Sequence, residues 1–209
     1  MAITDFFDRG WRAGPDGIAF IAGDRTFSYR EIGELSCRVG NGLLARGIVT
    51  EAKGAVLAGN DPVAWACVLG LWRAGMAWVP VNAANPPEDI QRQLASFDCE
   101  VLFCHAKFLP VVEKLRSGLP ALHTVVFIDG DGAGSAAVGG TTLALFLEGA
   151  STNVPALIPA SESVAGIMPT RGTTGSRETE ARRPPGSMFN IAKVPITRYR
   201  YRGVKIPNP

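Results

Sequence analysis

Residues 55–81, AVLAGNDPVAWACVLGLWRAGMAWVPV, are the stretch that decides the fold. Two short apolar runs, 55–58 and 76–81, lie on either side of a segment that opens with Asn60-Asp61-Pro62. These three residues supply a helix cap and a first-turn proline, so a helix is predicted from there to about Ala74. Strands of nearly continuous apolar residues joined by a helix are typical of a parallel sheet that is buried on both faces.

The same alternation continues along the chain. A helix with Ile90 and Leu94 on one face is expected to start at Asn85-Pro86, and another is expected around 106–116. Further apolar runs predict strands at 100–104, 123–128 and 163–169. The sequence therefore predicts an α/β fold, a mostly parallel sheet with helices on both faces.

The residues before this unit predict smaller elements. Thr4 is expected to cap a short helix that ends near Arg12. The runs 18–22 and 25–29 flank Gly23-Asp24 and predict a β-hairpin. Ser28 and Glu31 have the spacing of a capping box, which predicts a helix from there to near Gly47. Between the last two strands we expect a Gly-rich surface loop (129–140), a short helix (141–150) and a linker (151–163).

Composition and charge bound the class of protein. The chain has 209 residues, of which 46% are hydrophobic and 19% charged, as in globular proteins. No stretch approaches the ~20 apolar residues of a membrane span, and the N-terminus lacks the pattern of a signal peptide. Residues 1–176 carry 13 basic and 17 acidic side chains, a balance of −4, whereas residues 177–209 carry 8 and 2, a balance of +6. The chain thus changes character near Ser176.

The cysteines, tryptophans and histidines mostly favour structural roles. Cys37, Cys67, Cys99 and Cys104 are scattered through apolar segments without the spacing of a disulfide framework, which favours a reducing, cytoplasmic compartment. Cys99, Cys104 and His105 do not complete a four-ligand metal site, so no metal site is predicted. Trp65, Trp72 and Trp78 are interpreted as core or interface residues, and His105 and His123 as structural residues.

The segment Thr170-Arg171-Gly172-Thr173-Thr174-Gly175-Ser176 follows the last predicted strand and carries the candidate chemistry. Small and hydroxylated residues let the backbone approach a polyphosphate, and their N–H and O–H groups can donate to phosphate oxygens. The segment is not a Walker A loop, because that motif's Gly-Lys-Ser/Thr ending is absent. On composition alone, an ordinary turn remains the alternative.

The wider context resembles the adenylate-forming (AMP-binding) family. MPTRGTTGS (168–176) resembles that family's phosphate loop, in which a Ser/Thr and Gly-rich run ends in x-Pro-Lys-Gly. VLGLWRAGMAWVPVNAANPPEDIQRQL (68–94), RTFSYREI (25–32) and DCEVLFC (98–104) are similar to other segments of the family, in the same order. The resemblance covers residues 18 to 176.

This resemblance implies an activity. The family joins a carboxylate to ATP, forming an acyl-adenylate and pyrophosphate, and then passes the acyl group to a thiol such as coenzyme A. Fatty or other acyl acids would be the substrates. The resemblance implies a set of phosphate-binding residues by motif position, with magnesium bridging the phosphates. These residues would be Thr170, Gly172, Thr173, Thr174, Gly175 and Ser176. Arg171 stands where the family usually has Ser or Gly, and no catalytic residue is assigned.

The family pattern stops after Ser176. The chain continues Arg177-Glu178-Thr179, without the proline, lysine and glycine of the motif, and the family's adenine-binding, ribose-binding and C-terminal segments do not follow. The resemblance thus implies that residues 1–176 are a truncated N-terminal subdomain of an adenylate-forming enzyme. Because adenylyl transfer depends on positioning and charge neutralisation, we expect no adenylation by this chain.

Residues 177–209 form a basic, Pro-containing tail that is expected to be disordered or irregular. Its abrupt onset favours an out-of-frame or truncated gene product. The alternative is a non-catalytic module whose tail contacts nucleic acid or a protein partner through the run RYRYR (198–202). Binding to nucleic acid is the less favoured interpretation of the tail. Loss of downstream cover is expected to expose apolar surface and to promote self-association.

Overall fold

A seven-stranded sheet organises the structure, a computed structural model that describes residues 3–48, 50–157, 163–170 and 190–195. Its strand order is β7-β6-β5-β3-β4-β8-β9, and every neighbouring pair is parallel except β8 and β9. The strands are β3 (Lys53–Leu57), β4 (Ala77–Pro80), β5 (Val101–Cys104), β6 (Thr124–Phe127), β7 (Gly140–Thr142), β8 (Val164–Thr170) and β9 (Asn190–Pro195). The predicted α/β fold with a mostly parallel sheet is confirmed.

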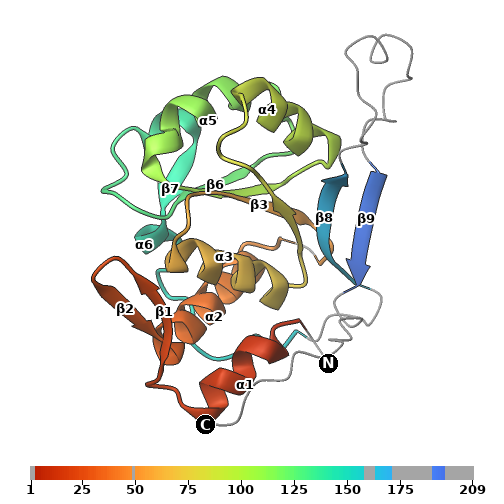
Figure 1. Ribbon diagram of the computed structural model, residues 1–209. Coiled ribbons are helices and arrows are strands. Elements are labelled where there is room, and N and C mark those ends of the chain that lie inside the picture. The colour runs from red at the N-terminus through yellow and green to blue at the C-terminus, as the bar shows by residue number, and fades with distance from the viewer. Residues whose placement is uncertain (1–2, 49, 158–162, 171–189, 196–209) are drawn as a thin grey trace.

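Helices cover both faces of this sheet, with α4 and α5 on one side and α2 and α3 on the other (Figure 1). Alternate residues of each strand point to opposite faces, so neighbouring apolar residues enter two separate cores. Val56 belongs to the core under α2 and α3, whereas Ala55 and Leu57 belong to the core under α4 and α5. The helices are α1 (Asp5–Ala13), α2 (Tyr29–Ala45), α3 (Pro62–Arg73), α4 (Pro87–Ser96), α5 (Leu109–Arg116) and α6 (Leu143–Phe146), with two 3₁₀ turns, η1 (Ala106–Phe108) and η2 (Ser135–Val138).

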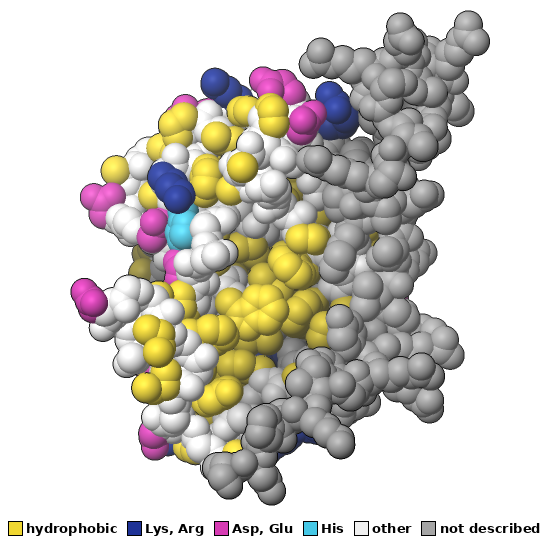
Figure 2. Space-filling view, viewed as in Figure 1, with side chains coloured by type: hydrophobic (Ala, Val, Ile, Leu, Met, Phe, Trp, Pro, Cys, Tyr) yellow, Lys and Arg dark blue, Asp and Glu magenta, His cyan; other side chains and the backbone are white. Residues whose placement is uncertain are grey.

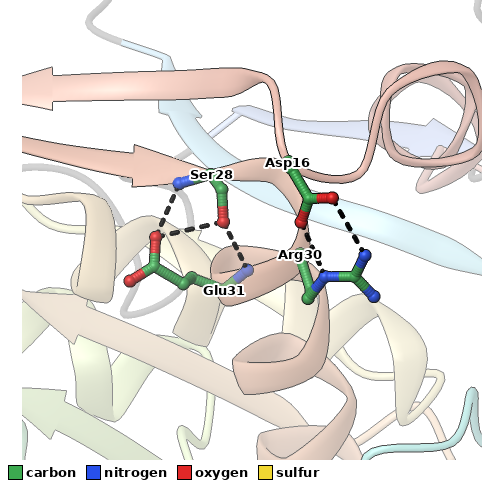
Figure 3. Close-up of polar contacts among 4 residues, drawn as sticks. All are labelled: Asp16, Ser28, Arg30 and Glu31. Atoms are coloured by element: carbon green, nitrogen blue, oxygen red, sulfur yellow. Dashed lines mark hydrogen bonds and ion pairs between the residues drawn. The ribbon is translucent and has the colours of Figure 1, made fainter.

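The predicted hairpin and capping box are both present. Strands β1 (Ile18–Ala22) and β2 (Arg25–Ser28) pair antiparallel. Ser28 then caps α2: its Oγ accepts from the Glu31 N–H at 3.1 Å, and the Glu31 carboxylate accepts from the Ser28 N–H at 2.7 Å (Figure 3). The same view shows Arg30 beside Asp16, with Nε 2.9 Å from Oδ1.

Helices α2 and α3 approach each other closely. A methyl group added at Gly70 would lie 2.4 Å from Cγ1 of Val39, so only glycine fits at this crossing. Arg73, at the end of α3, donates to Ser36 Oγ at 2.8 Å and pairs with Asp8 of α1 at 2.5 Å. One buried guanidinium therefore ties three helices together.

Several predicted boundaries were wrong. Thr4 precedes α1 without a side-chain capping bond, because its own backbone is already helical. Helix α4 begins at Pro87, one residue after the predicted Asn85-Pro86 start. Within the predicted Gly-rich loop and helix (129–150), η2 and β7 form, and α6 spans only Leu143–Phe146.

Strand β9 lies within the tail that the sequence predicted to be disordered or irregular, and it pairs antiparallel with β8. The rest of 177–209 lies outside the described residues. Among the described residues, no helix is long and apolar enough to cross a membrane. All four cysteines are buried and unpaired.

Candidate functional site

Strand β8 carries the predicted phosphate loop to one edge of the sheet. Gly166 lies opposite Trp78 in the parallel pairing of β8 with β4, so the two strands end at the same edge. Thr170 is the last residue of β8. The other predicted phosphate-binding residues, Gly172, Thr173, Thr174, Gly175 and Ser176, lie outside the described residues. The structure thus describes the approach to the predicted loop through the backbone of Thr170.

The carboxyl edge of the sheet also contains a point where the strand order reverses. From β3 the chain crosses through α3 to β4 on one side, whereas β5 lies on the other side of β3 and leads outward to β6. Ligands of open α/β sheets bind in the crevice outside such a reversal. Here the crevice lies between the loop after β3 and the residues after β5.

A histidine–aspartate contact spans this crevice. His105 Nε2 lies 2.7 Å from Asp61 Oδ2, and Nδ1 of the same ring accepts from the Gly59 N–H at 3.3 Å. Because Nδ1 accepts, the arrangement assigns a neutral imidazole whose Nε2–H donates to the carboxylate. Asp61 Oδ1 accepts from the Val63 N–H at 2.8 Å and caps α3, as the sequence predicted. His105 is therefore a structural link between two loops, in agreement with the sequence interpretation.

The neighbouring thiol is not a nucleophile. Burial, with a smaller contribution from the nearby Asp129 carboxylate, raises the pKa of Cys104 to about 12. A thiol with that pKa stays protonated at neutral pH, and the thiolate is the reactive form. Cys104 and His105 therefore do not form a catalytic pair.

An aromatic-walled cleft lies beside the same edge. It has a volume of about 450 Å³, and Asp61 is the one charged side chain among its lining residues, which include Phe20, Trp65 and Trp78. Apolar side chains gather over α3 on this face (Figure 2).

The three predicted structural tryptophans form one cluster in this region. Trp65, Trp72 and Trp78 pack edge to face, with ring centroids 5.6 to 6.3 Å apart. Trp72 donates its indole N–H to the Ala165 carbonyl at 2.6 Å, whereas the buried Trp78 indole N–H has no hydrogen-bond partner among the described residues.

Among residues that the structure describes, no group of three His, Cys, Asp or Glu side chains could hold a metal ion. The segment from Thr170 to Ser176 offers hydroxyl and backbone N–H donors where β8 ends, which suits a polyphosphate. The prediction that this segment binds the phosphates of ATP with magnesium falls, beyond Thr170, on residues outside the described part of the chain.

Two contacts of this region could not be predicted from the sequence. Asp61 and His105 are distant in sequence, as are Trp72 and Ala165. Asp61 was recognised as a helix cap and Trp72 as a core residue, but no local pattern links either residue to its partner. Only the strand order brings each pair together.

An open, mostly parallel sheet with helices on both faces and a reversal of strand order defines the class as a doubly wound α/β domain. The chain belongs to the AMP-binding enzyme family, whose sequence pattern matches residues 7–177. The resemblance inferred from the sequence is thereby confirmed.

Curated relatives are bacterial ligases and peptide synthases. The 3-hydroxybenzoate–CoA/4-hydroxybenzoate–CoA ligase of Thauera aromatica is 28% identical over 157 residues, which cover 75% of this chain and 29% of that protein. The 4-hydroxybenzoate–CoA/benzoate–CoA ligase of Rhodopseudomonas palustris is 33% identical over 129 residues, 61% of this chain and 24% of that protein. Tyrocidine synthase 3 of Brevibacillus parabrevis is 31% identical over 106 residues, 51% of this chain and 2% of that protein. The chain therefore spans less than a third of the length of these relatives.

Solved structures share the fold. The anthranilate CoA ligase AuaEII in complex with anthranoyl-AMP superposes with a TM-score of 0.75 at 23% identity, over 84% of this chain and 33% of that one. An acyl-CoA synthetase of Brucella canis superposes with a TM-score of 0.72 at 20% identity, over 94% and 33%. The described fold is thus that of the N-terminal part of these ligases.

Proposed function

We propose that this chain is the phosphate-loop portion of an ATP-dependent acyl-activating ligase. In that reaction a carboxylate oxygen attacks the α-phosphorus of ATP and pyrophosphate leaves. The thiol of coenzyme A then attacks the acyl carbon of the acyl-adenylate, so that the thioester forms and AMP and a proton are released. The observation that carries the proposal is the course of β8, which runs parallel to β4 and ends at Thr170, directly before the hydroxyl-rich segment.

The loop residues would act by binding and orientation. The Thr170, Thr173, Thr174 and Ser176 hydroxyls and the backbone N–H groups would donate to oxygens of the β- and γ-phosphates. Bound ATP with magnesium supplies the adenylyl group and the leaving pyrophosphate. The chain's own task is to hold the polyphosphate in place at the sheet edge.

A direct test of this role is the affinity for ATP in the presence of magnesium, measured by calorimetry at millimolar nucleotide. Replacing Thr173 and Thr174 together by valine removes two donors at nearly constant volume. We expect about 30-fold weaker binding, since each of the two hydrogen bonds contributes about 1 kcal/mol. Thr152→Val is the matched control, because Thr152 is exposed in the segment after α6. Equal affinity in all three proteins would contradict the assignment.

We further propose that the chain alone does not form acyl-adenylate. The lysine of the family motif is replaced by the run Arg177-Glu178-Thr179, and the chain covers less than a third of the relatives that it matches. Pyrophosphate exchange into ATP should therefore stay at background with panels of fatty and aromatic carboxylic acids. Aromatic acids belong in the panel because two relatives are named as benzoate-type ligases. Exchange above background with any acid would refute this proposal.

A cytoplasmic location is proposed on the chemistry of the thiols. Four buried, unpaired cysteines suit a reducing compartment. The alternative reading, a binding module with a nucleic-acid-contacting tail, has no support from the described part of the chain. Salt-dependent binding to DNA or RNA, without stabilisation by ATP, would favour that alternative.

A further inference from the structure

A buried hydrogen bond joins Trp72 of α3 to Ala165 of β8. The indole N–H donates to the Ala165 carbonyl at 2.6 Å, and the two residues are 7% and 1% exposed. A bond of this kind, shielded from water, resists rupture because both groups would otherwise be left buried and unpaired. It joins a helix on one face of the sheet to the strand that leads to the predicted phosphate loop.

Strand β8 pairs with β9 at six positions, but its ladders with both neighbours are irregular next to Ala165. Among the described residues, β4 and β8 are registered at the single pair Trp78–Gly166, whereas β3 and β4 are registered at four pairs. On its other side, β8 shifts register against β9 between Val164 and Gly166, so Ala165 is the bulged residue. Pro195, opposite Val164, has no N–H to offer. The Trp72 indole therefore supplies a donor where the backbone ladder is broken.

The helix that carries Trp72 is firmly held. Gly70 packs directly on Val39 of α2, and Arg73 bonds to Ser36 and Asp8. The Trp72 ring is also fixed by edge-to-face contacts with Trp65 and Trp78. The donor therefore occupies a fixed position against which β8 can be aligned.

We propose that Trp72 is a positioning residue for the phosphate loop, because its indole N–H fixes the register of β8 through the Ala165 carbonyl. A slip of one residue would move Thr170 by about 3.3 Å and exchange the two faces of the strand. Phosphate recognition by backbone donors would not survive such a displacement. The consequence for ATP rests on the proposed function, whereas the alignment of β8 does not.

Two matched variants test the alignment. Trp72→Phe removes the donor and keeps an aromatic ring. Trp78→Phe makes the same change in the same cluster, at an indole N–H that has no partner in the described part of the chain. Hydrogen–deuterium exchange of the peptide that covers 163–170 should be roughly tenfold faster in Trp72→Phe and unchanged in Trp78→Phe. Equal exchange in the two variants overturns the proposal.

Affinity for ATP separates this inference from the proposed function. Trp72→Phe should weaken binding about five- to tenfold while Trp78→Phe binds as the wild type does. Equal losses in both variants would overturn the positioning role. If the wild type itself binds no ATP, the proposed function fails, and the exchange measurement still decides whether Trp72 aligns β8.

A spectroscopic measurement covers the case in which Trp72→Phe does not fold. The triple variant Trp11→Phe, Trp65→Phe, Trp78→Phe leaves Trp72 as the single tryptophan, since the chain has four. Addition of ATP should shift its emission with the same midpoint as the calorimetric titration. Emission that does not respond to saturating ATP would overturn the link between Trp72 and the loop.

Discussion

At the residue scale, Ser28 shows how one side chain sets the start of a helix. Its hydroxyl and backbone N–H exchange hydrogen bonds with Glu31, which satisfies two backbone donors of the first turn of α2. The same bonds hold the pKa of the Glu31 carboxyl below its usual value. Because the pKa of Glu31 is lower in the folded chain than in the unfolded chain, the bonds stabilise the folded state at pH values above the unfolded pKa. That stabilisation is lost as the pH falls through the folded pKa.

Replacing Ser28 by alanine should lower the free energy of unfolding by about 1 kcal/mol, because a helix cap is lost. Urea titration at neutral pH measures the change. Ser28→Thr keeps the hydroxyl and should lose much less. Equal losses in the two variants would show that the hydroxyl bond does not stabilise α2.

The buried thiols give a second prediction at this scale. Burial raises the pKa values of Cys99 and Cys104 from 9.0 to about 12. Between these values the unfolded chain releases protons that the folded chain keeps, so stability should fall as pH rises above about 9. The midpoint of urea unfolding, measured from pH 8 to 10.5, gives the slope of stability against pH.

Replacing both thiols with alanine should flatten that slope. It also lowers stability at every pH, because apolar volume is lost. An unchanged slope in the double variant would assign the pH dependence to other groups. Ellman's reagent at pH 8 should react with the unfolded chain and only slowly with the folded one.

At the element scale, the crossing of α2 and α3 depends on Gly70. Gly70→Ala places a methyl group 2.4 Å from Val39 Cγ1, so the helices must move apart. We expect a loss of about 1–3 kcal/mol in the free energy of unfolding, measured in urea. Gly14→Ala is the control, since nothing lies within 4 Å of its added methyl group. A neutral Gly70→Ala would show that the crossing adapts without cost.

The elements that could be predicted from sequence are those with strong local signals. Strands β3, β5 and β6 contain the apolar runs 55–57, 101–104 and 125–127, which are buried on both faces of the sheet. The cap residues Ser28 and Asp61 mark helix starts. Strand β7 escaped prediction because Gly140–Thr142 has no apolar residue, and its pairing with β6 alone makes it a strand. Strand β9 escaped because it lies in a basic segment and depends on β8 as its partner.

The candidate site also has a part that the sequence could predict and a part that it could not. The phosphate loop was predicted at Thr170 to Ser176 because its residue types are unusual after an apolar strand, and it stays a prediction because residues 171–176 lie outside the described ones. The contacts Asp61–His105 and Trp72–Ala165 could not, because each joins residues that only the crossovers of the sheet bring together. Local chemistry is visible in a sequence, whereas strand order is a property of the whole domain.

At the scale of the whole molecule, apolar surface remains uncovered. Ile18 and Ile21 on β1 are 60% and 71% exposed, and Ile21 also lines the aromatic-walled cleft. Exposed apolar patches next to a strand edge promote association between chains. The sequence prediction of self-association is therefore retained as a proposal with a defined surface.

Sedimentation velocity should show association that grows with protein concentration. Replacing Ile18 and Ile21 together by threonine keeps β-branched side chains and should reduce that association. Val154→Thr is the control, because Val154 is 60% exposed and does not line the cleft. A wild-type chain that stays monomeric at every concentration and melts in one sharp transition would contradict the proposal.

The place of β8 next to β4 has a consequence for the order of events during synthesis. Trp78 and Gly166 are neighbours in the sheet, yet β5, β6 and β7 are all translated between them. The ribosome therefore releases β3 to β6 early enough for them to pair before Gly166 emerges. The entropy lost in closing so long a loop grows only with the logarithm of its length. We therefore expect β8 to dock late, onto a platform of β3 to β6 that has already assembled without it.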